Sequence, residues 1–274
     1  MELQYVAIFL ITGIGVGFSA GLLGIGGCFI MVPVQYWVYV SMGVTPDIAI
    51  KMAFGTNLFV VLPTAISGAL GHHRKGAVWW KTSVYLGISG MIGAVIGATL
   101  ATHVPGNILK IVFGAIILAG GIRMLTATPP KVAGEPVQKP ISLLLWGFPL
   151  GIATGFVGIG GGVIMVPIMT LFLRYSMHQA VGTSTAMMLF TCLGGLIGYI
   201  VNGWGVSGIP SPNLGYVHIW SWLALAATSI IMARVGAGVA HKIPGKQLKI
   251  IFIIVMFYMG LKMIGVFQWL HLPL

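Results

Sequence analysis

Long apolar stretches follow one another along almost the whole chain, and short polar or glycine- and proline-rich connections separate them. The first set comprises residues 3–41, 52–70, 83–101 and 107–125, and the second comprises residues 142–173, 182–199, 217–235 and 247–267. An α-helix needs about 20 apolar residues to cross the hydrocarbon core of a bilayer. The pattern therefore predicts an all-α polytopic membrane protein.

A polar segment divides the two sets. Residues 127–141 contain four prolines together with Lys131, Glu135 and Lys139, a composition typical of a linker. We expect a first membrane repeat at residues 1–126, a proline-rich cytoplasmic linker at 127–141 and a second membrane repeat at 142–274.

Sequence landmarks recur in the same order on both sides of this linker. GLLGIGGCFIMVP at residues 21–33 matches GFVGIGGGVIMVP at 155–167 at nine of 13 positions, and GTN at 55–57 corresponds to GTS at 182–184. Residues 97–113 match residues 236–252 at nine of 17 positions. Such ordered self-similarity indicates an internal duplication. Each half then contains one glycine-interrupted block and three further apolar segments.

The positions of Lys and Arg bear on how the two halves are oriented. If each glycine block crossed the membrane once, the connections on the two sides would carry seven of these residues each. If each block instead returns to its own side, 11 of the 14 lie on the side of the linker, and only Lys51, Lys110 and Lys262 lie on the other. Cytoplasmic connections carry an excess of positive charge. We therefore expect two inverted-topology repeats, each a glycine-tipped broken helix hairpin plus three transmembrane helices.

Length places the tip of at least the second hairpin inside the membrane. Residues 142–173 would measure about 48 Å as one helix, whereas two full crossings need about 60 Å. The first block, 3–41, is longer, and the same reasoning is weaker for it. Discontinuous helices that meet near the midplane form the solute sites of many transporters.

Composition and charge exclude several classes of function. Hydrophobic residues make up 58% of the chain and charged residues 6%, too few for the surface of a soluble protein. The net charge of +11 comes from cations that stand singly between apolar segments, so we expect them to orient the chain in the bilayer and expect no nucleic-acid partner. The acidic residues Glu2, Asp47 and Glu135 lie outside clear spans, and we find no catalytic or metal-binding motif. We expect no enzyme, no metal site and no cofactor.

The two glycine-rich tips are the first candidate site. Glycine-rich backbone that enters a helix offers free N–H groups and the positive end of a helix dipole, which suits an anion. The alternative role is close helix packing through small residues, but two copies inside interrupted blocks favour a solute-lining role. The candidates are Gly24, Gly26 and Gly27 in the first copy and Gly158, Gly160, Gly161 and Gly162 in the second.

Neutral polar side chains downstream of each tip are the second candidates. Thr56, Asn57, Thr183 and Ser184 have hydrogen-bond donors that can hold an anion. They stand where apolar segments begin, so N-cap hydrogen bonding is an equally good interpretation. Lys51 and His178 align with each other upstream of these residues, where they would add positive potential at a mouth of the pathway; interfacial snorkelling is the alternative role for Lys51.

Taken together, these motifs resemble the TauE/SafE family of sulfite exporters over essentially the whole chain. The resemblance rests on the doubled Gly-x-Gly-Gly motif followed by proline, on the Gly-Thr-Asn/Ser stretches and on Pro-Gly-x-x-Leu-Lys at 105–110 and 244–249. It implies a permease of the bacterial or archaeal cytoplasmic membrane for sulfite, sulfoacetate or related small sulfur-containing or organic anions. Cys28 departs from the second copy, which has Gly162 at the same place.

We therefore predict a multi-pass transporter whose partners are a small anionic substrate and the lipid bilayer. An inside-negative membrane contributes about 2.3 kcal/mol per charge per 100 mV, which favours export by alternating access around a central site. A proton-coupled small-anion importer that uses His178 and an anion channel are the alternatives. A membrane-embedded enzyme or a structural subunit fits the duplicated polar breaks less well. The sequence leaves open the exact solute, the transport direction, the coupling ion, the oligomeric state and whether the first glycine block fully crosses the membrane.

Overall fold

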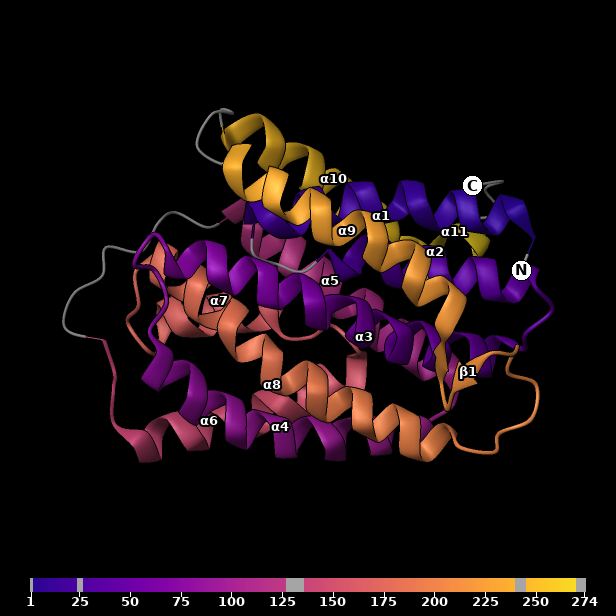
Figure 1. Ribbon diagram of the computed structural model, residues 1–274, viewed down its shortest axis with the longest axis horizontal. Helices are drawn as coiled ribbons and strands as arrows, with labels where there is room; N and C mark the ends of the chain where they lie inside the picture. Colours follow the sequence, from indigo (N-terminus) through magenta and orange to yellow (C-terminus); the bar gives the residue numbers. More distant parts are fainter. Residues whose placement is uncertain (1, 24–26, 127–135, 240–244, 270–274) are drawn as a thin grey trace.

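The computed structural model describes residues 2–23, 27–126, 136–239 and 245–269. These ranges form an antiparallel bundle of helices with one short β-hairpin (Figure 1). The helices are α1 (Leu3–Leu23), α2 (Cys28–Ser41), α3 (Pro46–His73), α4 (Trp80–His103), α5 (Gly106–Thr126), α6 (Pro140–Val157), α7 (Gly162–Leu171), α8 (Met177–Gly203), α9 (Ile219–Val239), α10 (Gly245–Ile264) and α11 (Val266–Trp269). The hairpin consists of β1 (Asn213–Leu214) and β2 (Val217–His218).

Within the described residues, seven helices are long and apolar enough to cross a membrane: α1, α3, α4, α5, α6, α8 and α9. The helices α2 and α7 are shorter, with 14 and 10 residues. Each glycine-interrupted block is therefore a hairpin with one long and one short arm, and the short arm covers only about 21 Å or 15 Å. This confirms the predicted all-α membrane fold and shows that the two arms of a block are unequal.

The helix α4 illustrates why these sequences form membrane helices. Val84, Ile88, Ile92, Ile96 and Leu100 recur every fourth residue and are exposed, which gives α4 an apolar outer face suited to lipid. The opposite face carries small buried residues that allow neighbouring backbones to approach closely.

The connections between helices gather at two ends of the bundle. At one end, Tyr175 hydroxyl bonds Thr82 Oγ1 at 2.7 Å and donates to Val137 carbonyl oxygen at 3.0 Å, which joins the starts of α4, α6 and α8. We call this the linker end, because α5 ends and α6 begins there (Figure 1). At the other end, the terminal end, Tyr5 hydroxyl donates to Ser41 carbonyl oxygen at 3.3 Å.

The two halves exchange helices, and the glycine contacts show it position by position. A Cβ at Gly17 of α1 would collide with the backbone of Ser229 in α9, and a Cβ at Gly151 of α6 would collide with that of Gly90 in α4. Gly17 and Gly151 are 134 residues apart, the spacing of the glycine motifs, and Ser229 is 139 residues from Gly90, the spacing of the late repeat. The pairs α1–α9 and α6–α4 are thus equivalent, and each joins the first arm of one half to a helix of the other.

The segment boundaries expected from hydropathy differ from the observed elements at two places. The segments expected at 52–70 and 182–199 begin earlier, at Pro46 and Met177, because Lys51 pairs with Asp47 inside α3 and a Ser176–Gln179 capping box starts α8. The charge-free connection 201–215 also contains β1 and leads into β2, a two-stranded hairpin that hydropathy does not reveal.

Candidate functional site

The tip of the second hairpin is a backbone reversal between α6 and α7. Gly158, Gly160 and Gly161 have φ values of 64°, 79° and 121°, which side-chain-bearing residues rarely adopt. Asn57 Nδ2 of α3 donates to the Gly158 carbonyl oxygen, and Thr191 Oγ1 of α8 donates to that of Gly160 at 2.8 Å. Two helices from opposite halves therefore each hold one carbonyl group of this tip.

The N–H groups of the same tip have a different environment. The helix α7 begins at Gly162 with Gly161 as its N-cap residue and with no side-chain cap. The first N–H groups of a helix have no partner within it. Asn57 and Thr191 already occupy the carbonyl oxygens of Gly158 and Gly160, whereas the start of α7 offers N–H donors without a side-chain cap.

Packing places this tip near the middle of α3 and α8. A Cβ at Gly158 would lie 2.5 Å from Phe54 Cβ, and a Cβ at Gly160 would lie 3.0 Å from Cys192 Sγ and 3.2 Å from Val61 Cγ1. Val61 and Cys192 are each close to the midpoint of their helices. The second tip is therefore buried at mid-depth, the place that its length predicts.

The first tip is described only in part, because Gly24 and Gly26 lie outside the described residues. Gly27 has φ 63° and packs against Val16 and Ser19 of α1. It precedes α2, which begins at Cys28 and, like α7, has no side-chain cap. The described part of the first tip therefore ends in the same kind of uncapped helix start as the second.

The two Gly-Thr stretches do not begin helices, so their interpretation as N-caps is wrong. Thr56 and Thr183 lie ten and six residues beyond the first residues of α3 and α8. Thr56 Oγ1 accepts the N–H of His218 at 3.1 Å, and Thr183 Oγ1 accepts the N–H of Trp79 at 3.1 Å. Thr56 thus anchors the residue that precedes α9, and Thr183 anchors the residue that precedes α4. Both α9 and α4 are helices that the halves exchange.

The remaining candidates are dispersed. Ser184 Oγ donates to Val181 carbonyl oxygen within α8, so the structure does not bring it to the second tip as it does Asn57. Lys51 is buried and its Nζ lies 2.7 Å from Asp47 Oδ2, while Asp47 Oδ1 accepts the N–H of Gly106 at 2.6 Å. His178 is exposed in the first turn of α8 at the linker end.

A narrow crevice leads from the linker end to the second tip. Its volume is about 20 Å³, room for about one water molecule. It extends from His72 near the end of α3 to Val61 and Met188, whose side chains border Gly160. Its other lining residues are Ala20 and Gly21 of α1, Thr64, Ala65 and Gly68 of α3, Thr185 of α8 and Ala233 of α9.

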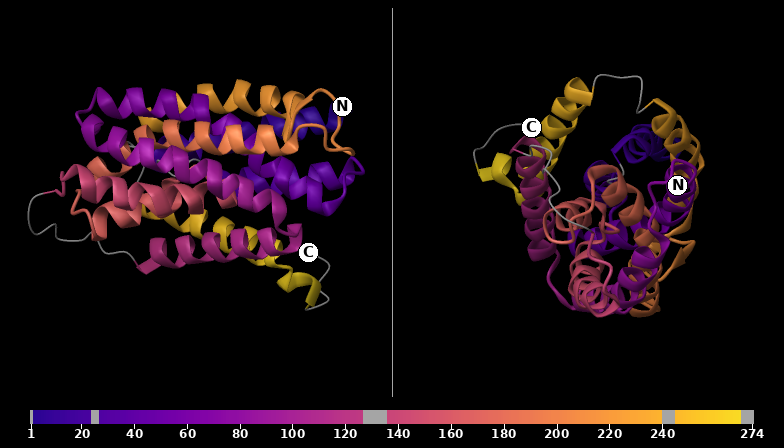
Figure 2. Two further views of the ribbon diagram at one scale, coloured as in Figure 1. Left: turned by 90° about the horizontal axis from the view of Figure 1, so that it is seen from below. Right: turned by 90° about the vertical axis from the view of Figure 1, so that its left-hand side faces the viewer.

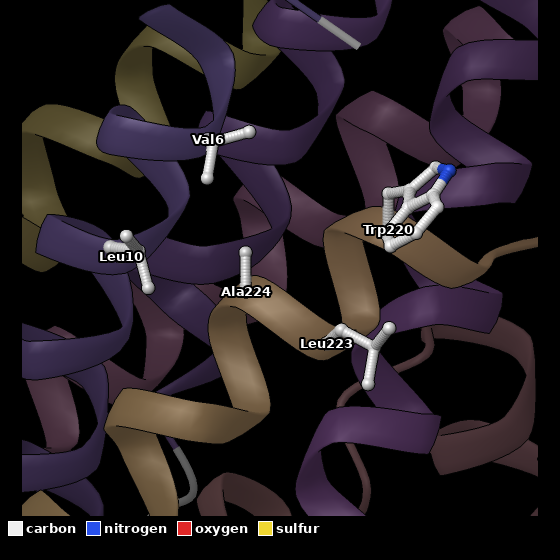
Figure 3. Close-up of a pocket in the computed structure, with 5 residues that line it drawn as sticks. All are labelled: Val6, Leu10, Trp220, Leu223 and Ala224. Atoms are coloured by element: carbon white, nitrogen blue, oxygen red, sulfur yellow. The ribbon is translucent and has the colours of Figure 1, made fainter. Parts of the chain in front are cut away.

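A wider hollow of about 540 Å³ lies elsewhere, between α1 and α9 (Figure 3). It is lined by Val6, Leu10, Trp220, Leu223 and Ala224, of which Trp220 is 50% and Leu223 43% exposed. This hollow contains none of the predicted site residues and is lined by outward-facing apolar side chains. We assign it to the lipid-facing surface.

Thr191, Gln35 and His218 are buried polar residues that the sequence patterns do not single out. The internal repeat could have identified Thr191, because Thr64 stands at the equivalent position of the first repeat, 127 residues earlier. Thr64 lines the crevice, and Thr191 holds the second tip. Gln35 and His218 have no polar counterpart that would have identified them.

His218 makes stability depend on pH. Its Nδ1 lies 2.7 Å from Ser221 Oγ, and burial lowers the pKa of His218 from its ordinary 6.5 to about 4. The unfolded chain then binds a proton that the folded protein excludes, so stability is complete above about pH 6.5 and decreases toward pH 4. We expect a loss of up to about 3 kcal/mol over this window, measured as thermal unfolding in detergent. His218→Gln should flatten the profile; an unchanged profile in that variant would contradict the assignment.

The fold and site define a class of proteins: polytopic membrane proteins with exchanged helices and a glycine-rich helix break in the protein interior. A family model described as sulfite exporter TauE/SafE matches residues 9–263. The chain belongs to this family, and it is a membrane transporter of that type.

Curated relatives agree with this assignment. A "probable membrane transporter protein" of Methanocaldococcus jannaschii is 31% identical over 258 residues, which cover 94% of both chains. A protein of the same description from Haemophilus influenzae is 27% identical over 245 residues, 89% of this chain and 92% of the relative. No solved structure matches the chain.

Proposed function

We propose that the protein moves small sulfur-containing or organic anions, such as sulfite or sulfoacetate, and that it works as an exporter. The observation that carries this proposal is that the carbonyl groups and the N–H groups of the second tip have different environments. Asn57 and Thr191 occupy the carbonyl groups of Gly158 and Gly160, while the N–H groups at the start of α7 have no side-chain cap. Buried backbone donors at a helix N-terminus stabilise negative charge without a cationic side chain.

Charge in the interior is consistent with this choice of ligand. Among the described residues, Lys51 is the buried side chain with a permanent charge, and Asp47 neutralises it. A site built of neutral donors can bind an anion and still release it, because it forms no full ion pair with the solute.

The inverted arrangement of the repeats is part of the proposal. The hairpin α1–α2 begins and ends at the terminal end, whereas α6–α7 begins and ends at the linker end (Figures 1 and 2). The Lys and Arg residues whose side chains are described follow the same division: the linker end carries Arg74, Lys75, Lys81, Arg123, Lys139, Arg174 and Arg234, and the other end carries Lys51, Lys110 and Lys262. Positive charge is retained on the cytoplasmic side, which supports a cytoplasmic linker end in a bacterial or archaeal cytoplasmic membrane.

Alternating access would begin at the crevice. At about 20 Å³ it admits little more than one water molecule, so an anion enters only when α1, α3, α8 and α9 separate at the linker end. The exchanged pairs α1–α9 and α4–α6 are close-packed and suited to move as units.

Flux measurements in proteoliposomes test this function. We expect saturable movement of sulfite, sulfoacetate or thiosulfate out of the compartment that faces the linker end. This movement should accelerate when that compartment is made negative. Empty liposomes and the Gly160→Leu variant serve as controls. No movement of any of these anions would overturn the proposal, non-saturating single-channel conductance would indicate a channel, and dependence on an inward proton gradient would indicate a proton-coupled importer.

A further inference from the structure

Gln35 of α2 is a buried amide without a hydrogen-bond partner. Its side chain is 0% exposed, and neither Nε2 nor Oε1 has a partner among the described residues. Buried amides are almost always hydrogen-bonded, because leaving their donors and acceptors unpaired destabilises the fold. In a transporter, a side chain of this kind is a candidate to bind the solute.

Helix geometry places Gln35 at the depth of the second tip. Tyr39, four residues later in α2, directs its hydroxyl to Thr56 Oγ1 of α3 at 3.3 Å. Residues four apart lie on one helix face, so Gln35 also belongs to the side of α2 that meets α3. Because α2 and α3 run antiparallel, Gln35 lies about one turn further along α3 than Thr56, at the level of Val60 and Val61. Val61 contacts the second tip at Gly160.

The second repeat has an apolar residue at the equivalent place. Gln35 is the seventh residue after Cys28, and Met169 is the seventh after Gly162. Met169 is also 0% exposed and belongs to an apolar core cluster. Methionine has nearly the length of glutamine, so the fold tolerates an apolar side chain at this position, and packing does not account for the amide in the first repeat.

Asn57 supplies a second unpaired atom within about one helical turn of that level. Its Nδ2 is used by Gly158, but its Oδ1 is buried without a partner in the described part of the chain. Donors from Gln35 Nε2 and the start of α7 suit anionic oxygens, whereas Gln35 Oε1 and Asn57 Oδ1 need a ligand that donates a hydrogen bond.

We propose that Gln35 binds the transported solute and selects oxyanions that also carry an O–H or N–H group. This inference rests on the proposed anion transport and specifies the chemistry of its solute. Hydroxyl-bearing sulfonates and hydrogensulfite have both kinds of group. Sulfoacetate and thiosulfate carry no such donor at neutral pH, so the inference ranks them below hydrogensulfite among the proposed solutes. A sulfonate with an alkyl chain alone would leave the two acceptor oxygens unpaired, and such a site rejects ligands that lack the donor.

Two probes that differ by one hydroxyl group test the inference. We expect the wild-type protein in proteoliposomes to prefer 2-hydroxyethanesulfonate over ethanesulfonate by about tenfold or more in the ratio of maximal rate to half-saturating concentration. Gln35→Met should remove this preference, so that the ratio for the two sulfonates is about one. The thermal unfolding temperature of this variant should rise or stay the same. Met169→Leu is the matched control and should retain the wild-type preference.

The outcomes separate the inference from the function on which it rests. If wild-type protein moves neither sulfonate nor sulfite, anion transport itself fails. If it moves them but Gln35→Met discriminates as the wild type does, Gln35 does not select the solute. Equal loss of preference in Met169→Leu would assign the effect to general packing and would also overturn the inference.

Discussion

Leucine in place of Gly160 should reduce anion flux by about 100-fold or more, because small displacements in a binding site have effects of this size. The φ of 79° disfavours any side chain, and a Cβ would lie 3.0 Å from Cys192 Sγ and 3.2 Å from Val61 Cγ1. The tip must therefore move away from α3 and α8, and the N–H groups of α7 move with it. Initial rates in proteoliposomes measure the effect.

A leucine at Gly15 is the matched control. Gly15 lies in α1 and is exposed, and a Cβ added there would have no described neighbour within 4 Å. We expect near-normal flux from Gly15→Leu. Normal flux from Gly160→Leu, with both variants monodisperse in detergent, would refute a solute site at the second tip.

Asn57→Leu should have the second large effect. The substitution keeps the approximate volume but removes the donor to Gly158, which leaves a buried carbonyl group unpaired at a cost of about 1–3 kcal/mol. The hydrogen bond from Thr191 to Gly160 then remains on the carbonyl side of the tip, without the anchor from α3. We expect flux to fall at least about tenfold, together with a lower unfolding temperature.

Ser184→Ala is the comparison that the internal repeat provides. Ser184 corresponds to Asn57, but its hydroxyl bonds only to Val181 within its own helix. We expect a change of less than about 0.5 kcal/mol and nearly normal flux. Similar losses in both variants would mean that the described asymmetry between the two positions has no bearing on transport.

Hydropathy and charge alone predict much of this fold. The order of the apolar segments, the two hairpins and the assignment of Lys51, Lys110 and Lys262 to one end all depend on local composition, which hydropathy and Lys/Arg counts measure directly. The errors arise where a specific pair overrides local polarity. Asp47 and Lys51 give residues 46–51 the polarity of a connection, yet their ion pair lets α3 begin at Pro46.

The candidate site is less predictable because its contacts span long sequence separations. The chemistry of Asn57 predicts a solute ligand, but its partner Gly158 is 101 residues away and only the fold reveals it. Thr183 has similar chemistry and instead anchors Trp79. A single sequence cannot identify Gln35, because a lone glutamine in an apolar helix is usually hydrogen-bonded. Only the fold shows that its amide has no partner among the described residues.

The exchange of helices between the halves has a consequence for how such a protein could have originated. The glycine-lined surface at Gly17 of α1 is covered by α9, and that of α6 at Gly151 is covered by α4, so in each half the other half covers this face of the first helix. A single half made alone would present an uncovered seam, and a second copy of itself would be its natural complement. Within one chain, the pairs α1–α9 and α4–α6 therefore make the kind of contact that helix exchange makes between the subunits of a homodimer.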